Sequence, residues 1–234
     1  IAKTLVEAIN EGNDKDHLKA LVSIRKTVIA LNENVHPLLA LGPPFMDSIY
    51  QSTASTNLHI AHEALWIINN LCSTSFTKDI ISKPNFLAFL IRDRLVHPES
   101  PAIRAITVWI LANIAADSAT QHLLTCDPEV LTGILVETGG KPPHPSDPHR
   151  WSSSLLGPAL VAIGNDLTSR HDSGESNVDE ELDIFTWFLS ILCLPLGKRS
   201  SLSEPHFRWA YTIVFPILQS LLFRFSGPPF PGIN

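Results

Sequence analysis

The chain has 234 residues, of which 44% are hydrophobic and 17% are charged, so it can bury a sizeable core without disulfides or metals. Its 23 acidic residues outnumber the 17 Lys and Arg residues, which gives a formal net charge of -6. This balance argues against a general nucleic-acid binder, because neutralising phosphates requires a basic surface. We therefore expect a folded protein whose partner is basic and is not a nucleic acid.

Four long segments have apolar residues at steps of three and four, which predicts helices over residues 18–31, 59–72, 86–96 and 103–116. Strand-like alternation is scarce, so the predicted fold class is all-α. Proline and glycine clusters separate the segments. Shorter helices are expected between them, at 35–41, 44–51, 77–82, 120–126 and 129–137.

The second half of the chain is less regular. A proline-rich segment at 139–148 and an acidic segment at 169–183 are expected to be exposed loops. The apolar segments 185–196 and 211–223 are shorter than the ~20 residues that span a bilayer, so we interpret them as buried helices. The tail at 226–234 has three prolines and two glycines and is expected to be disordered.

The three cysteines, Cys72, Cys126 and Cys193, are far apart and form no CxxC pair. This pattern is typical of reduced thiols rather than of a disulfide framework, and it indicates a location in the cytoplasm or nucleus. The first residues show no charged segment followed by a long apolar run, so no secretory signal is expected.

Two of the long segments repeat each other. Trp66 and Asn70 have the same spacing as Trp109 and Asn113, and the two Trp-x-x-x-Asn motifs are 43 residues apart. A third copy keeps Asn165 but has a valine in place of the tryptophan. A period of ~40 to 47 residues is typical of solenoids built from two- or three-helix repeats.

Each repeat has the order short helix, helix, long helix, and it must stack on a neighbour to cover its apolar face. This predicts an armadillo-type, right-handed α-solenoid of three-helix repeats over residues 1–225. The clearest repeats are expected at about 33–74, 75–118 and 119–169. Divergent helices are expected at 179–225.

The strings EALWIINN (residues 63–70) and WILANIAADS (residues 109–118) resemble the third helices of consecutive armadillo repeats in importin-α, the nuclear-import adaptor. The resemblance covers about residues 19–169. It implies a non-enzymatic binding module without a cofactor, which binds the Lys/Arg-rich nuclear localisation signal of a cargo protein. It also implies importin-β as a partner if a basic segment precedes the repeats.

On a helix, Glu63, Trp66 and Asn70 fall on one stripe. Stacked repeats would align such stripes into a ladder, in which the asparagine amides hold a peptide main chain and neighbouring indoles form slots for Lys or Arg stems. By the resemblance, Asp117 is the acid that meets the principal lysine. Asp166 occupies a position expected to be buried, so the third repeat must be distorted or exposed there.

Other interpretations stay open. The tryptophans could be plain packing between repeats, and the asparagines could bond neighbouring carbonyls. The chain would then be an armadillo-like scaffold without a cargo groove, associated with a membrane through its apolar C-terminal region. No enzyme motif or convincing metal spacing is found, and we expect His59, His62, His144 and His149 to hold no metal.

Overall fold

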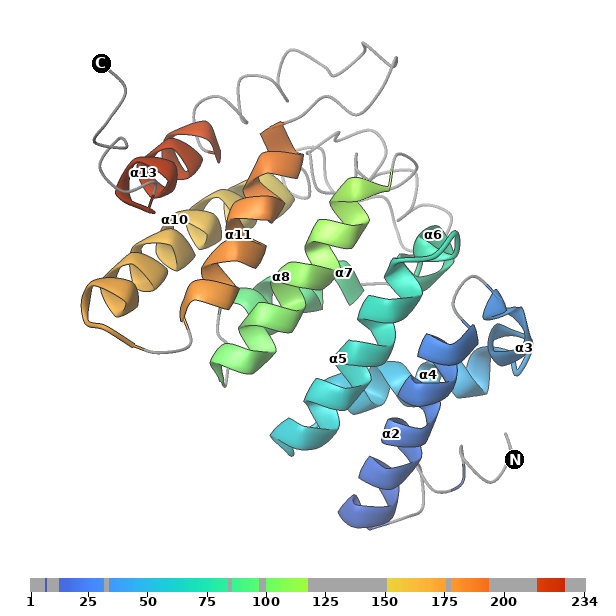
Figure 1. The fold of residues 1–234 in the computed structure, drawn as a ribbon. Coiled ribbons are helices and arrows are strands. Elements are labelled where there is room, and N and C mark those ends of the chain that lie inside the picture. The colour runs from blue at the N-terminus through green and yellow to red at the C-terminus, as the bar shows by residue number, and fades with distance from the viewer. Residues whose placement is uncertain are drawn as a thin grey trace. The chain divides into compact units, whose positions relative to one another are not determined.

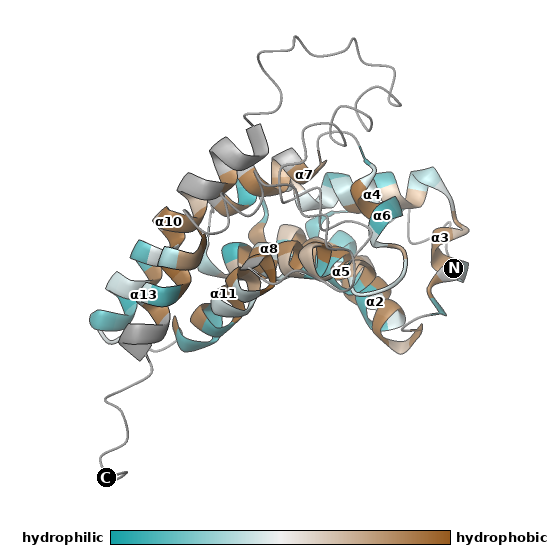
Figure 2. Cartoon of the chain, turned by 90° about the horizontal axis from the view of Figure 1, so that it is seen from above, coloured by the Kyte–Doolittle hydropathy of each residue, from teal (hydrophilic) through white to brown (hydrophobic). Residues whose placement is uncertain are grey.

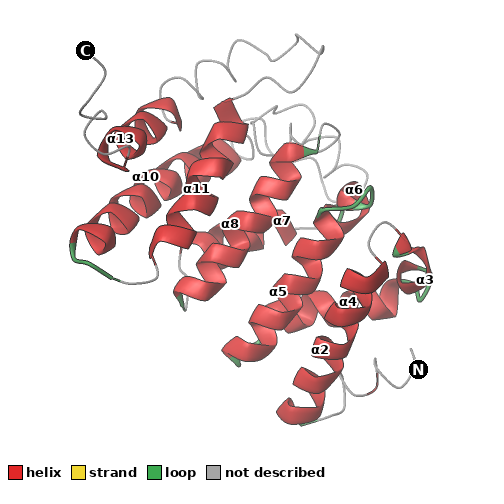
Figure 3. Ribbon diagram, viewed as in Figure 1, coloured by secondary structure: helices red, strands yellow, loops and turns green. Residues whose placement is uncertain are grey.

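The computed structural model describes Glu7 and residues 13–31, 34–83, 86–96, 100–117, 151–175, 178–193 and 214–225. All regular elements within these ranges are helices, which confirms the all-α class (Figure 3). The chain divides into two compact units, Ile1–Asp117 and Ser118–Asn234. Each unit is considered by itself.

The first unit is a stack of helical repeats (Figure 1). The long helices α2, α5 and α8 lie side by side in one row, and the shorter helices α4, α6 and α7 form a second row behind them (Figure 2). The order of short helix, helix and long helix occurs twice, which confirms an armadillo-type solenoid arrangement. The helices are α2 (Asp14–Leu31), α3 (His36–Leu39), α4 (Pro43–Thr53), α5 (Leu58–Cys72), α6 (Thr77–Ile81), α7 (Phe86–Phe89), η2 (Leu90–Val96) and α8 (Pro101–Ala116).

Capping side chains fix where α5 and α8 begin. The Asn57 side chain accepts a hydrogen bond from the His59 N–H, and the Ser100 hydroxyl accepts one from the Ile103 N–H. Each bond satisfies a backbone donor that the first turn of a helix leaves open. Pro101 follows the Ser100 cap, where its fixed φ suits the first turn and its missing N–H costs nothing.

The 43-residue step also extends to α2, so α2, α5 and α8 share one pattern of burial. At three successive levels of the helix the equivalent residues of all three helices are buried. Fully burying each large apolar side chain contributes about 1.5–3 kcal/mol. The levels are Leu21, Ala64 and Thr107; then Ile24, Ile67 and Ile110; then Val28, Leu71 and Ile114.

The helix expected over 86–96 is divided. Residues Phe86–Phe89 are α-helical, and Leu90–Val96 form wider π-helical turns. Arg94, which is 4% exposed, lies in this part. Its Nε donates to the Thr53 carbonyl at the end of α4 (3.1 Å), and its guanidinium lies 5.3 Å from the Phe89 ring centroid. A buried guanidinium requires such acceptors, and apolar periodicity does not reveal them.

The second unit contains α10 (Trp151–Asp172), α11 (Val178–Cys193) and α13 (Phe215–Phe225), which pack against one another. Gly164 lies where α10 meets both partners. A Cβ at this position would be 3.0 Å from Ile217 Cγ2 and 3.7 Å from Phe185 Cε1. The missing side chain therefore permits the close approach of these helices.

The exposed loop expected at 169–183 is shorter than predicted, because α10 continues to Asp172 and α11 begins at Val178. The Arg170 guanidinium lies 2.7–2.9 Å from the Glu175 carboxylate oxygens and 2.8 Å from Glu181 Oε2. These ion pairs join the two helices, and acidic side chains in the first turn of α11 suit the positive end of the helix dipole.

The Asp166 side chain is 43% exposed, so the acid is tolerated there.

Several expected features lie outside the described residues. They are the helices at 120–126 and 129–137, the loop at 139–148 with His144 and His149, the side chains of Cys126 and Cys193, and the tail at 226–234. Within the ranges that are described, no helix combines the length and the apolar character needed to cross a bilayer.

Cys72 provides a test of the packing of α5. Its side chain is buried, and burial, reinforced by the negative charge of Asp117, raises the pKa of the thiol well above its usual range. In a variant carrying Cys126→Ser and Cys193→Ser, we expect the native protein not to react with a thiol reagent such as 5,5′-dithiobis(2-nitrobenzoate) at pH 8. After unfolding in guanidinium, one equivalent should react. Rapid reaction of the native variant would contradict this packing.

Candidate functional site

The two ladder tryptophans are in contact. Trp66 of α5 and Trp109 of α8 are both half-buried, and their ring centroids are 5.3 Å apart with an interplanar angle of 63°. This is an edge-to-face pair, which contributes about 0.5–1.5 kcal/mol beyond the burial of area. A Lys stem between two indole faces needs about 7–8 Å between them, because carbon atoms make contact at about 3.5–4.0 Å. The expected slot is therefore closed in this structure.

Asn70 is bonded within its own helix. Its Nδ2 donates to the Trp66 carbonyl at 2.7 Å, one turn earlier. This bond uses one of the two N–H groups of the carboxamide, whose oxygen is also an acceptor. Asn70 is half-buried, at the surface of α5.

Asn113 joins the two repeats. Its Nδ2 lies 3.0 Å from Asn69 Oδ1 and 3.5 Å from the Asn69 carbonyl oxygen. Asn69 is 4% exposed, and the sequence analysis missed it. The available signal was a polar residue on the buried side of α5, since a buried carboxamide needs a partner.

The two acidic residues of the predicted site have different surroundings. Glu63 is held by α2, because Arg25 Nε donates to its Oε2 at 2.6 Å, so its charge is already balanced. Asp117 follows the last turn of α8, and its backbone N–H donates to the Asn113 carbonyl at 3.2 Å. Its effect on the pKa of Cys72 places its negative charge near the end of α5.

Asn165 is not brought to this surface by the packing of α5 and α8. It lies on α10 in the second unit, where both Asn165 and the neighbouring Val161 are exposed. The structure thus brings together Glu63, Trp66, Asn70, Trp109 and Asn113, with Asp117 at the end of α8.

His62 borders the tryptophan pair. Its ring makes an edge contact with Trp66, with the centroids 6.4 Å apart. Burial lowers the pKa of His62, and the nearby cation Arg25 acts in the same direction, while Glu63 opposes them. Among the residues described, no group of three His, Cys, Asp or Glu side chains is placed to hold a metal ion.

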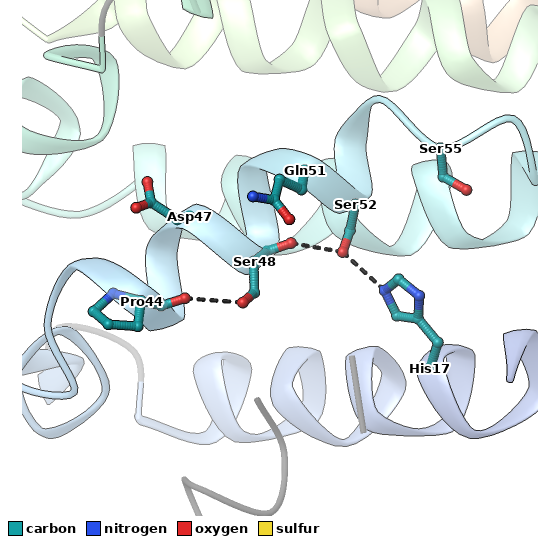
Figure 4. Close-up of a pocket in the computed structure, with 7 residues that line it drawn as sticks. All are labelled: His17, Pro44, Asp47, Ser48, Gln51, Ser52 and Ser55. Atoms are coloured by element: carbon teal, nitrogen blue, oxygen red, sulfur yellow. Dashed lines mark hydrogen bonds between the residues drawn. The ribbon is translucent and has the colours of Figure 1, made fainter. Parts of the chain in front are cut away.

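A separate pocket of about 480 Å³ lies between α2 and α4 (Figure 4). The Ser52 hydroxyl donates to the Ser48 carbonyl (2.7 Å), so His17 Nε2, 2.8 Å from Ser52 Oγ, is the donor in that contact. A serine nucleophile needs a base that accepts its proton. In this pair the histidine donates to the serine oxygen instead of accepting its proton, so Ser52 is not activated. The hydrogen bond joins α2 to α4.

Comparisons with known proteins gave likenesses of shape only. No family model matches the sequence, and no curated protein matches it. One designed armadillo repeat protein aligns with 93% of this chain and all of its own length, at 14% identity and a TM-score of 0.49. Another, titled as a complex with the peptide (KR)4, covers 95% of this chain and 98% of its own, at 18% identity and a TM-score of 0.48.

The contact between Asn69 and Asn113 predicts a difference between two adjacent asparagines. Replacing Asn69 with Ala should lower the free energy of unfolding by about 1–3 kcal/mol, because the amide of Asn113 loses its closer acceptor, Asn69 Oδ1. Replacing Asn70 with Ala should change it by less than about 0.5 kcal/mol, since the gain in helix propensity offsets the lost local bond. Urea unfolding followed by circular dichroism measures both. Equal losses would contradict the assigned contact.

Proposed function

We propose that the chain binds an extended, Lys/Arg-rich segment of a partner protein across α5 and α8. The observation that supports this best is the pair of half-buried indoles in contact across consecutive repeats. Each indole is followed four residues later by an asparagine, which brings aromatic faces and carboxamides together on one surface.

The closed slot changes how a cation would bind. A Lys or Arg head packs on the outer faces of the indole pair, where a cation-π contact contributes about 0.5–2 kcal/mol. Entering between the rings would forfeit the edge-to-face energy of about 0.5–1.5 kcal/mol. The peptide main chain bonds the remaining amide N–H and oxygen of Asn70, and Asp117 supplies negative charge near the end of α8.

The number of contacts sets the affinity. The two hydrogen bonds to Asn70 at ~1 kcal/mol each, with one or two cation-π contacts, give only a few kcal/mol before ordering costs. This corresponds to a dissociation constant near the border between millimolar and micromolar. The described surface alone is therefore a weak and readily reversible binding site.

We further propose that the basic segment is a nuclear localisation signal and that the chain acts like a nuclear-import adaptor in the cytoplasm and nucleus. The Trp-x-x-x-Asn repeat and its resemblance to importin-α support this. Recruitment of importin-β would require a basic segment upstream of the repeats.

A scaffold without a cargo groove is the second candidate, and specific contacts favour it. Asn70 and Asn113 already donate to protein acceptors, and Glu63 is balanced by Arg25. In this case Asn113 and Glu63 stabilise the stacking of repeats, Asn70 is satisfied within α5, and none of them binds a peptide.

Peptide titration separates the two functions. A fluorescein-labelled Lys-rich peptide should bind the native chain at low salt and lose about five- to tenfold in affinity with Trp109→Ala, which removes one indole of the pair. The matched control is Trp187→Ala, because Trp187 is 42% exposed on α11 in the second unit. Circular dichroism checks that both variants stay folded. Equal binding to all three proteins, or none to the native chain, would favour the scaffold.

A further inference from the structure

Helix α2 continues the surface of α5 by one more repeat, but with different chemistry. Ser23 and Thr27 stand 43 residues before Trp66 and Asn70, and both are exposed. The Thr27 hydroxyl donates to the Ser23 carbonyl at 2.9 Å, as the Asn70 amide donates to the Trp66 carbonyl. The rung on α2 therefore has neither an indole nor a carboxamide.

Two lysines flank this rung. Lys19, Ser23 and Lys26 are spaced four and three residues apart, which places them on one face of α2, and all three are exposed. We call these three residues the cationic stripe. The separation of Lys19 and Lys26 along the helix axis is about 10 Å, at 1.5 Å per residue, so both ammonium groups can reach one anion lying beside Ser23.

The charges around the stripe leave it positive. No acidic residue occurs in α2 between positions 17 and 31. The two acids of the first turn accept from the neutral amides of Asn57 (2.8 Å to Asp14) and Asn13 (3.0 Å to Asp16) and keep their charge, but the three lysines of α2 outnumber them. Arg25 is committed to Glu63. By contrast, α5 has no Lys or Arg, and α8 has only Arg104, which is 9% exposed.

We propose that the cationic stripe receives an acidic side chain of the same peptide whose basic residues bind at α5 and α8. This rests on the proposed function. A carboxylate can accept from two ammonium groups and from the Ser23 hydroxyl, whereas a further Lys or Arg at this level would be repelled. The preferred partner is thus a segment of mixed charge and not a uniformly basic one.

The spacing of the helices determines how far the acidic residue of the peptide should be from its basic residues. Packed helices lie about 8–10 Å apart, and an extended chain advances about 3.3–3.6 Å per residue. One helix therefore corresponds to about three residues. Because the indole pair lies between α5 and α8, the acidic residue should be about three to five residues from the Lys or Arg that binds the indoles.

Matched peptides test the proposal. A Lys-rich peptide with Glu four residues from its basic pair, on either side, is compared with the same peptide carrying Gln and with one carrying Glu ten residues away. At low salt the near Glu should tighten binding to the native chain by roughly three- to fivefold over Gln, as expected for exposed ion pairs. The distant Glu should give little gain, and the advantage should shrink at high salt.

Variants of the protein assign the effect. In the variants Lys19→Ser and Lys26→Ser, the preference for Glu over Gln should fall. In the double variant Lys19→Glu, Lys26→Glu the charge of the stripe is reversed, so a peptide with Lys in place of the near Glu should bind more tightly. Lys78→Ser, an exposed lysine on α6, is the matched control and should keep the preference. Suppose that the peptides bind and that binding depends on Trp109, but that the Glu and Gln peptides bind equally well. That result overturns this inference and leaves the proposed function standing. If no peptide binds the native chain, the proposed function fails with it.

Discussion

The packing of α5 against α8 is the interaction on which the rest of the first unit depends. Its buried side consists mostly of apolar residues in 43-residue register, such as Ile67 with Ile110 and Leu71 with Ile114. Once these residues interlock, neither helix can rotate or slide without exposing them. The residues on the opposite stripe are then held in register too, which brings the indoles into contact and places Asn113 against Asn69.

The surface that could bind a peptide also holds the repeats together, and this sets its character. Each hydrogen bond that a ladder asparagine makes to the protein leaves one fewer amide group for a bound peptide. The two indoles present their outer faces to a peptide but leave no open slot between them. Electrostatics adds an asymmetry. Asp117 lies at the end of α8 and Glu63 of α5 is balanced by Arg25, whereas exposed lysines lie on α2. A partner that crosses all three helices meets positive charge at α2 and negative charge at the end of α8.

Much of this architecture could be predicted from spacing. The repeated Trp-x-x-x-Asn motif locates α5 and α8, and the apolar steps of three and four identify their buried sides, because both depend only on helix geometry. The edge contact of the indoles and the pairing of Glu63 with Arg25 depend on side-chain rotamers and on distances between helices, which a single sequence does not contain. The acidic segment after α10 was misjudged because Arg170 pairs with residues of that segment and of α11.

A double-mutant cycle tests the central claim that the register of α5 and α8 sets the two indoles in contact. The free energy of unfolding is measured for the native chain, for Trp66→Ala, for Trp109→Ala and for the double variant. The account predicts a coupling energy of about 0.5–1.5 kcal/mol, as for an edge-to-face aromatic pair. Losses that simply add, with a coupling near zero, would show that the two rings do not meet and would contradict the account.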